Sequence, residues 1–162
     1  MKKIFLFFLI VLPFYLVFSI YSLDKDYFLC PIKYKGRVII RSDSRGNGSF
    51  ASPRNGNRLH NGIDLLAEME APVYASRSGR VIAAGGNNGM GNYVKIEHRE
   101  GLVTIYGHLS QIYVTLNEFI RQGKIIGTVG KTGNANHPKI QPHLHFEVRK
   151  GDIPQNPLDF LE

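Results

Sequence analysis

Short runs of β-branched and aromatic residues, separated by glycine or asparagine, occupy most of the chain after residue 30. Such runs between turn-forming residues are typical of β-strands. No stretch after residue 30 keeps a helical hydrophobic period for ten residues, which argues against the long helices that cover a parallel sheet. The sequence therefore predicts a mainly β, antiparallel fold, with strands at residues 37–41, 62–66, 72–76, 79–85, 92–98, 102–109, 124–130 and 143–150.

The run at residues 92–98 shows how these strands are expected to lie. Val94 and Ile96 fall on one side of an extended chain, and Tyr93 and Lys95 fall on the other, so one face is predicted to be buried and the other wet. The glycine-rich stretch at 85–91 lacks the Lys-Ser/Thr ending of a phosphate-binding loop. We predict that it is a wide turn between two strands.

The N-terminal part of the chain differs from the rest. Residues 4–23 carry no charge, and about 20 apolar residues are enough to cross a bilayer as a helix. The sequence leaves open whether this hydrophobic helix is a cleaved signal or a retained membrane anchor. Lys2 and Lys3 favour an N-terminus inside the cell, so residues 1–29 are expected to deliver a single domain, residues 30–162, outside the cytoplasmic membrane.

Charge and cysteine content narrow the range of partners. After residue 30 the chain has 17 Lys and Arg against 11 Asp and Glu. No nucleic-acid motif accompanies this excess, so nucleic acid is not expected as a partner. For an exported domain, either an anionic polymer of a bacterial wall or simply a solvated basic surface accounts for it. Cys30 is the only cysteine, which excludes an intrachain disulfide and a cysteine-based structural zinc site.

Two sequence pairs are candidates for metal binding. His60 precedes Asp64 by four residues, and His143 precedes His145 by two. In a strand, residues two and four apart face the same side, so each pair is expected to converge, with Gly62 leaving space between His60 and Asp64. Imidazoles and one carboxylate in a set of three are typical of catalytic zinc, which keeps its fourth position open for water.

Three further histidines have no partner at ligand spacing. His108 follows a predicted strand, where a surface or capping histidine is the ordinary interpretation, and His98 and His137 are expected to be ordinary surface residues. From spacing alone, none of the three is assigned to a metal site.

The order of the motifs resembles the lysostaphin-like (LytM-type) zinc metallopeptidases, which cleave peptide bonds in bacterial peptidoglycan. The likeness extends over about residues 41–161. The matching stretches are HNGID at 60–64, APVYA at 71–75, GRV at 79–81, GNYV at 91–94, YGHL at 106–109, GKIIG at 123–127 with Gly130 and Thr132-Gly133, and PHLHFEV at 142–148.

The resemblance implies a role for five residues. By position in the family's motifs, His60, Asp64 and His145 would bind one Zn²⁺ per chain, and His108 and His143 would be catalytic residues beside the ion. The implied fold is an antiparallel β core with an open groove that carries the zinc site. The implied activity is hydrolysis of peptide bonds in stem peptides or cross-bridges, by attack of a zinc-activated water. We expect the protein to be a monomer, located in the bacterial cell envelope.

Two positions depart from the family pattern. Asn117-Glu118 replaces the usual Gly-Asp turn, which is a tolerable substitution in a turn. A tyrosine that some members place shortly before the first ligand has no counterpart, because residues 54–59 contain no aromatic side chain.

Several functions remain open at this stage. A module of the same fold could bind the wall or activate another hydrolase without catalysis, and a three-ligand zinc site could hydrolyse esters or phosphates. The sequence does not identify the bond that is cut, and it does not say whether His108 or His143 is the general base.

Overall fold

The computed structural model describes residues 27–54 and 56–162, so the expected membrane helix at residues 4–23 lies outside its description. Within the described part, no helix is both long and apolar enough to cross a bilayer. Strands and three one-turn 3₁₀ helices are the regular elements there. The strands are β1 (Ser42–Asp43), β2 (Gly46–Asn47), β3 (Pro53–Arg54), β4 (Arg58–Leu59), β5 (Ile63–Leu66), β6 (Pro72–Tyr74), β7 (Gly79–Asn87), β8 (Gly91–Glu97), β9 (Leu102–Ile112), β10 (Phe119–Ile120), β11 (Ile125–Val129), β12 (His143–Lys150) and β13 (Ile153–Gln155). The 3₁₀ helices are η1 (Arg99–Gly101), η2 (Gly133–Ala135) and η3 (Pro157–Asp159).

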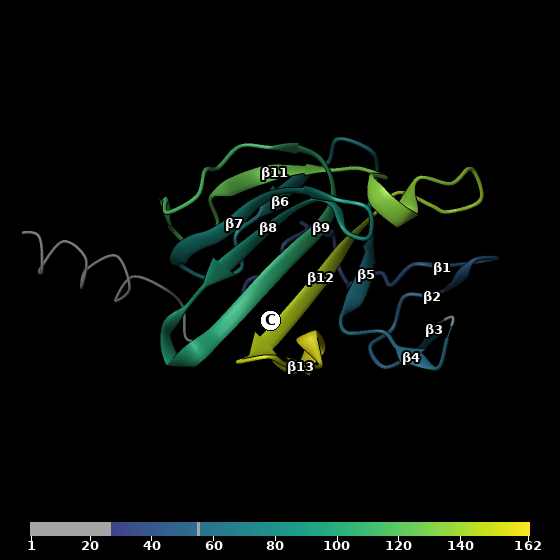
Figure 1. The fold of residues 1–162 in the computed structure, drawn as a ribbon, viewed down its shortest axis with the longest axis horizontal. Coiled ribbons are helices and arrows are strands. Elements are labelled where there is room, and N and C mark those ends of the chain that lie inside the picture. The colour runs from purple at the N-terminus through teal and green to yellow at the C-terminus, as the bar shows by residue number, and fades with distance from the viewer. Residues whose placement is uncertain (1–26, 55) are drawn as a thin grey trace, which may run out of the picture.

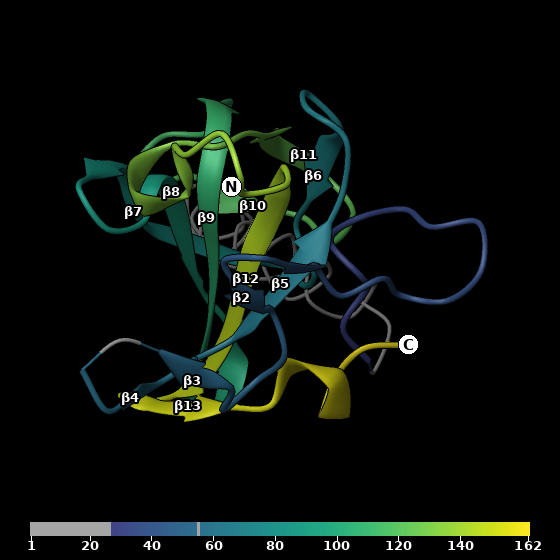
Figure 2. The same ribbon diagram turned by 90° about the vertical axis from the view of Figure 1, so that its right-hand side faces the viewer.

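One sheet of nine strands forms the body of the molecule. Its main path runs in the order β10-β7-β8-β9-β11-β6, and β12 joins β9 to β5 and β13. All pairings between the named strands are antiparallel. Figure 1 shows β12 between β9 and β5, with the small β1–β2 and β3–β4 hairpins beyond β5. Seen from that side, β12 and β5 lie near the middle of the molecule (Figure 2). The mainly β, antiparallel prediction is confirmed.

Along one edge of β9, the partner strand changes from β12 to β11. The first part of this strand pairs with β12 as far as Gly107, and the last part pairs with β11 from Leu109 onward. His108 lies between the two partners, and an isolated bridge joins Gly130 at the end of β11 to His143 at the start of β12. The beginning of β12 is therefore held next to His108, although the two histidines are far apart in the sequence.

Alternation along β12 separates the core from the polar face. Leu144, Phe146 and Val148 are fully buried in the hydrophobic cluster, whereas His143 and His145 point to the opposite side. Burying a large apolar side chain contributes about 1.5–3 kcal/mol, so a one-residue slip of β12 would exchange its core residues for histidines. The apolar residues of β12 thus set the direction in which its histidines face.

Most predicted strands are present, and β7 and β8 are joined by a turn, as expected. The turn is shorter than predicted, because residues 85–87 and Gly91 pair as strand residues and only residues 88–90 form the turn. Residues 37–41 differ, because only Ile40 forms a bridge, to Leu65. The backbone of this stretch bonds to β5 at two points, Arg41 N to Asp64 O and Leu66 N to Ile39 O, and the chain then turns into β1. The two contacts hold the segment against β5 without making a regular ladder.

His98 is not the surface residue that its sequence context predicts. Its side chain is buried, and its ring nitrogens meet Ser78 O at 2.9 Å and Thr104 Oγ1 at 2.7 Å. The ring also contacts Phe28 edge-on, with centroids 5.5 Å apart. Phe28 belongs to the core and forms a bridge with Leu161, so the segment ahead of β1 covers this histidine.

Candidate active site

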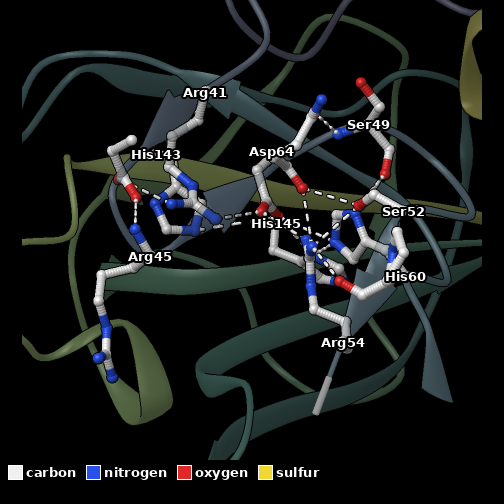
Figure 3. Close-up of polar contacts among 12 residues, drawn as sticks. Arg41, Arg45, Ser49, Ser52, Arg54, His60, Asp64, His143 and His145 are labelled. Carbon is white, nitrogen blue, oxygen red and sulfur yellow. Dashed lines mark hydrogen bonds and ion pairs between the residues drawn. The ribbon is translucent and has the colours of Figure 1, made fainter. Parts of the chain in front are cut away.

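The pairing of β5 with β12 brings two of the expected ligands together. Asp64 lies directly opposite His145 in this register, and Asp64 Oδ1 is 2.9 Å from His145 Nδ1. Both residues are buried. Figure 3 shows Asp64 and His145 at the centre of a polar cluster, with His60 on one side and His143 on the other.

His60 reaches the same point by a route that the sequence argument described wrongly. In a straight strand, residues four apart are about 13 Å apart, which is too far for both to bind one ion. Residues 61 and 62 instead form a bend ahead of β5, and His60 Nε2 lies 3.1 Å from Asp64 Oδ1. The convergence was expected, but the bend produces it.

Gly62 has a different role from the one expected. A Cβ atom at this position would lie 2.2 Å from the backbone oxygen of Phe146, far inside van der Waals contact. The glycine therefore allows the bend to pack on β12, rather than leaving room for an ion between His60 and Asp64.

The three candidate ligand atoms form a closed triangle. His60 Nε2 lies 3.0 Å from His145 Nδ1, and each of these nitrogens lies about 3 Å from Asp64 Oδ1. Three atoms bound to a tetrahedral zinc ion at 2.0–2.1 Å are about 3.3 Å apart, so an outward shift of a few tenths of an ångström would accommodate the ion. The donor set and its spacing fit zinc. Among the described residues, His60, Asp64 and His145 form a group that could hold a metal ion.

Backbone carbonyls orient three of the histidine rings. The Nδ1 atoms of His60, His108 and His143 lie 2.7–3.0 Å from the carbonyl oxygens of Ser49, Thr132 and Gln141, respectively. A carbonyl oxygen only accepts hydrogen bonds, so Nδ1 carries the proton in each ring. The Nε2 lone pair of each ring is then available to a metal ion or to substrate.

His145 is oriented in the opposite way. Its Nε2 donates to Glu147 Oε1 at 2.9 Å, while its Nδ1 faces Asp64 Oδ1. Burial disfavours the charged ring, but the hydrogen bonds to Asp64 and Glu147 outweigh burial and raise the pKa of His145 to about 9. Without metal, both ring nitrogens are therefore protonated at neutral pH. A metal ion would replace the proton on Nδ1 and leave the bond to Glu147 in place.

His108 and His143 lie together beside this triangle. Their ring centroids are 5.0 Å apart, and His143 Nε2 is 3.9 Å from Asp64 Oδ1. His108 occupies a bulge where the register between β8 and β9 shifts, and its φ of 60° is uncommon for a residue with a side chain. Burial, and then the charges of His145 and His143, lower the pKa of His108 to about 3. Burial also lowers the pKa of His143, so both rings are neutral at pH 7.

The outer oxygen of Asp64 faces two arginines. Oδ2 accepts hydrogen bonds from Arg41 Nη2 at 3.0 Å and Arg54 Nη2 at 3.2 Å. Burial tends to raise the pKa of Asp64, but its bonds to His145 and His60 dominate and hold the pKa far below its usual range. The carboxylate is therefore ionised and fixed with Oδ1 toward the histidines.

An open groove of about 990 Å³ passes over these residues. All five candidate site residues line it. One flank is formed by the segments around β1–β4, and the other by the turn after β7 and the loop around η2. The further lining residues include Arg45, Arg54, Leu59, Asn87, Met90 and Asn134.

Four residues that contact the site were missed by the sequence analysis: Arg41, Arg54, Glu147 and Arg149. Glu147 follows His145 by two residues, so the alternation that pairs the histidines could have found it. Arg149 continues the same alternation and bonds to Glu147 Oε2 through Nε at 2.6 Å. Arg41 is 23 residues from Asp64, and no local pattern indicates that contact.

Comparison with known proteins gives the same family as the motifs. A model described as peptidase family M23 matches residues 58–157. The chain is 42% identical over 101 residues to the DD-carboxypeptidase/endopeptidase Mpg of Neisseria meningitidis serogroup B, a match covering 62% of this chain and 22% of that protein. It is 32% identical over 137 residues to the peptidoglycan DD-endopeptidase ShyC of Vibrio cholerae, covering 84% of this chain and 30% of that protein. The chain thus spans less than a third of either relative.

Solved structures show the same fold. A zinc-containing peptidase from Vibrio cholerae superposes with a TM-score of 0.67 at 29% identity, over 83% of this chain and 40% of that chain. A chain of the SpoIIQ–SpoIIIAH pore-forming complex gives a TM-score of 0.69 at 28% identity, over 86% of this chain and 93% of that chain. With the family match over residues 58–157, the resemblance read from the motifs is confirmed, and this chain belongs to peptidase family M23.

Proposed function

We propose that this protein is a zinc-dependent endopeptidase that hydrolyses peptide bonds in the stem peptides or cross-bridges of peptidoglycan. One observation carries the proposal. His60, Asp64 and His145 converge on one point at the floor of the groove, and two neutral histidines with available Nε2 atoms lie beside them. A wall-binding module would have no need of these two rings.

The three converging residues are suited to hold zinc. Asp64 supplies Oδ1, His60 supplies Nε2 and His145 supplies Nδ1, and each is held by a second contact, with Arg41, Ser49 and Glu147 respectively. When bound, zinc supplies a Lewis acid that polarises the peptide carbonyl and lowers the pKa of water from about 16 toward about 7.

His108 and His143 are suited to move protons. Each keeps its Nδ1 proton on a backbone carbonyl, so Nε2 of either ring can accept a proton from the attacking water. The buried imidazolium that results is unfavourable, because burial lowers the pKa of both rings. It therefore returns the proton readily to the amine that leaves when the peptide C–N bond breaks.

The test is hydrolysis of purified sacculi by the full-length chain in detergent. We expect release of new amino groups, their loss with a chelator, and recovery on adding zinc. His143→Ala should lower the rate of release by about 10²-fold to 10⁴-fold, and Arg121→Ala, at an exposed position outside the groove, should leave it unchanged. Release of phosphate or reducing sugar instead would assign a different hydrolase. Mass spectrometry of muropeptides from several wall types would identify the bond.

A non-catalytic function is the second candidate, and one observation favours it. The fold neighbour of the SpoIIQ–SpoIIIAH complex comes from a pore-forming assembly. If this chain binds sacculi tightly but releases no amino groups in the presence of zinc, the wall-binding or hydrolase-activating function replaces the peptidase.

We propose further that the protein acts as a monomer in the bacterial cell envelope, outside the cytoplasmic membrane. The uncharged segment at residues 4–23 and the lysines before it support this location, as does a peptidoglycan substrate. Protease added to intact spheroplasts should degrade the domain. Its protection there would contradict the proposed location.

A further inference from the structure

Asp43, on β1, is neither a candidate ligand nor a candidate catalytic residue, but its carboxylate joins two segments that hold such residues. Only 9% of its side chain is exposed. Oδ1 accepts a hydrogen bond from the backbone N–H of Arg45 at 2.8 Å, and Oδ2 accepts one from the N–H of Gln141 at 3.0 Å. Oδ2 also forms an ion pair with Arg41 Nη1 at 2.7 Å. Both oxygens of this carboxylate are therefore engaged.

One contact of Asp43 leads to His143. The carbonyl of Gln141 accepts the Nδ1 proton of His143 at 2.7 Å, and Pro142 restricts the preceding residue to extended conformations. Gln141 lies between η2 and β12, outside the strands, so no strand ladder holds its backbone. The bond from its N–H to Asp43 therefore fixes the residue whose carbonyl orients the His143 ring.

Another contact of Asp43 leads to the candidate ligand Asp64. Arg41 is buried between the two carboxylates, with Nη1 on Asp43 and Nη2 on Asp64 Oδ2 at 3.0 Å. In Figure 3, Arg41 and His143 lie on the same side of Asp64, and His143 Nε2 is 3.9 Å from Asp64 Oδ1. The contacts thus form a closed ring, which passes through Asp64, Arg41, Asp43, Gln141 and His143.

We propose that Asp43 is a positioning residue, which holds His143 beside the metal position through Gln141 and binds neither metal nor substrate itself. The inference rests on the peptidase function proposed above and adds a residue to its machinery. A displacement of about 1 Å near a reacting group can cost roughly 10²-fold in rate, so loss of this carboxylate should affect the chemical step. Asp64 keeps both of its arginines without Asp43, so the metal site itself should persist.

The test measures zinc affinity, turnover and the His143 tautomer separately, on the full-length Asp43→Ala variant in detergent. Zinc affinity, measured by competition with a chelating dye, should stay close to that of the wild type. On soluble peptidoglycan fragments, kcat of the zinc-loaded chain should fall by about 10-fold to 100-fold with KM nearly unchanged, because His143 moves a proton and does not bind the fragments.

The tautomer is read by nitrogen NMR of the metal-free protein with labelled histidines. The His143 signals are identified by their absence in His143→Ala. The wild type should show His143 protonated on Nδ1 alone, because the Gln141 carbonyl accepts that proton. Asp43→Ala should show a mixture of both tautomers, because that carbonyl is no longer held in place. A loss of stability alone would not produce this change.

Three variants control for a merely structural effect. Asp43→Asn should be intermediate in kcat, because an amide oxygen still accepts one of the two backbone bonds, and it replaces Asp43→Ala if that variant does not fold. Asp152→Asn removes an exposed carboxylate outside the groove and should behave as wild type. Asn156→Ala removes the side-chain cap of η3, so it should lower stability without changing kcat or the tautomer.

Other outcomes overturn the inference. If the Asp43 variants kept the wild-type kcat, or if His143 kept a single tautomer in them, Asp43 would only stabilise the turn between β1 and β2. If they lost zinc to the same extent as a variant without the ligand His145, the carboxylate would act through the metal ligands instead. If the wild-type chain cleaves neither fragments nor sacculi, the peptidase proposal fails, and the tautomer alone decides whether Asp43 positions the ring.

Discussion

Glu147 accepts the Nε2 proton of His145 at 2.9 Å, on the side of the ring opposite to Asp64. The Glu147 side chain is almost fully buried, and its second oxygen is held by Arg149. The ring of His145 therefore lies between two carboxylates. Asp64 would bind the metal ion together with His145, and Glu147 determines which ring nitrogen of His145 faces the ion.

Replacing Glu147 by Ala should weaken zinc binding by about 10-fold to 100-fold, because His145 loses the acceptor that fixes its tautomer. Glu147→Gln should lose less, since an amide oxygen can accept the same bond. Zinc affinity is measured by competition with a chelating dye on the metal-free protein. Glu97→Ala, at an exposed position on β8, is the control. If Glu147→Ala and the wild type bound zinc with equal affinity, Glu147 would have no role in orienting His145 for the metal ion.

His143 and His145 should separate metal binding from catalysis. His143→Ala should retain zinc and lose activity on sacculi by about 10²-fold to 10⁴-fold, the usual range for a group that transfers protons. His145→Ala should lose the zinc itself, because it removes one of three ligands. Metal content is measured by elemental analysis after dialysis. If both variants lost zinc to the same extent, His143 would be a ligand and its assignment would be wrong.

Zinc binding should release protons in a pH-dependent way. The pKa of His145 is raised to about 9 in the metal-free protein, so Nδ1 is protonated at pH 7 and must lose its proton to bind metal. Below pH 9 the proton competes, so apparent affinity should rise by up to about tenfold per pH unit and level off above pH 9. Calorimetry in buffers of different ionisation enthalpy should give about one proton released at pH 7. A pH-independent affinity between pH 7 and 9 would contradict the raised pKa.

Gly62→Ala should destabilise the protein by about 1–3 kcal/mol, the usual range for overpacking. The added methyl group would lie 2.2 Å from Phe146 O, so the bend that carries His60 would have to move away from β12. Urea unfolding of the metal-free protein measures the change. Gly85→Ala is a matched control, because a Cβ there meets no atom within 4 Å. If both variants were equally stable, the bend would not depend on this contact.

Much of the fold could be predicted from local patterns. Turn residues separate the strands, and the alternation of apolar and polar residues identifies the face that each strand buries. Val94 and Ile96 are buried as their positions predicted. His98 was misjudged because its burial comes from Phe28, which lies 70 positions away in the sequence.

From the sequence by itself, spacing singled out His60, Asp64, His143 and His145 as candidate site residues, and the resemblance of the surrounding motifs added His108. Only the tertiary structure decided how they meet. The bend at residues 61 and 62, the bulge at His108 and the pairing of Asp64 with His145 depend on which strands lie side by side. The contacts of Arg41 with Asp64 and of Asp43 with Gln141 link segments 23 and 98 residues apart. Such contacts form only when packing of the apolar face places the strands, so no local pattern predicts them.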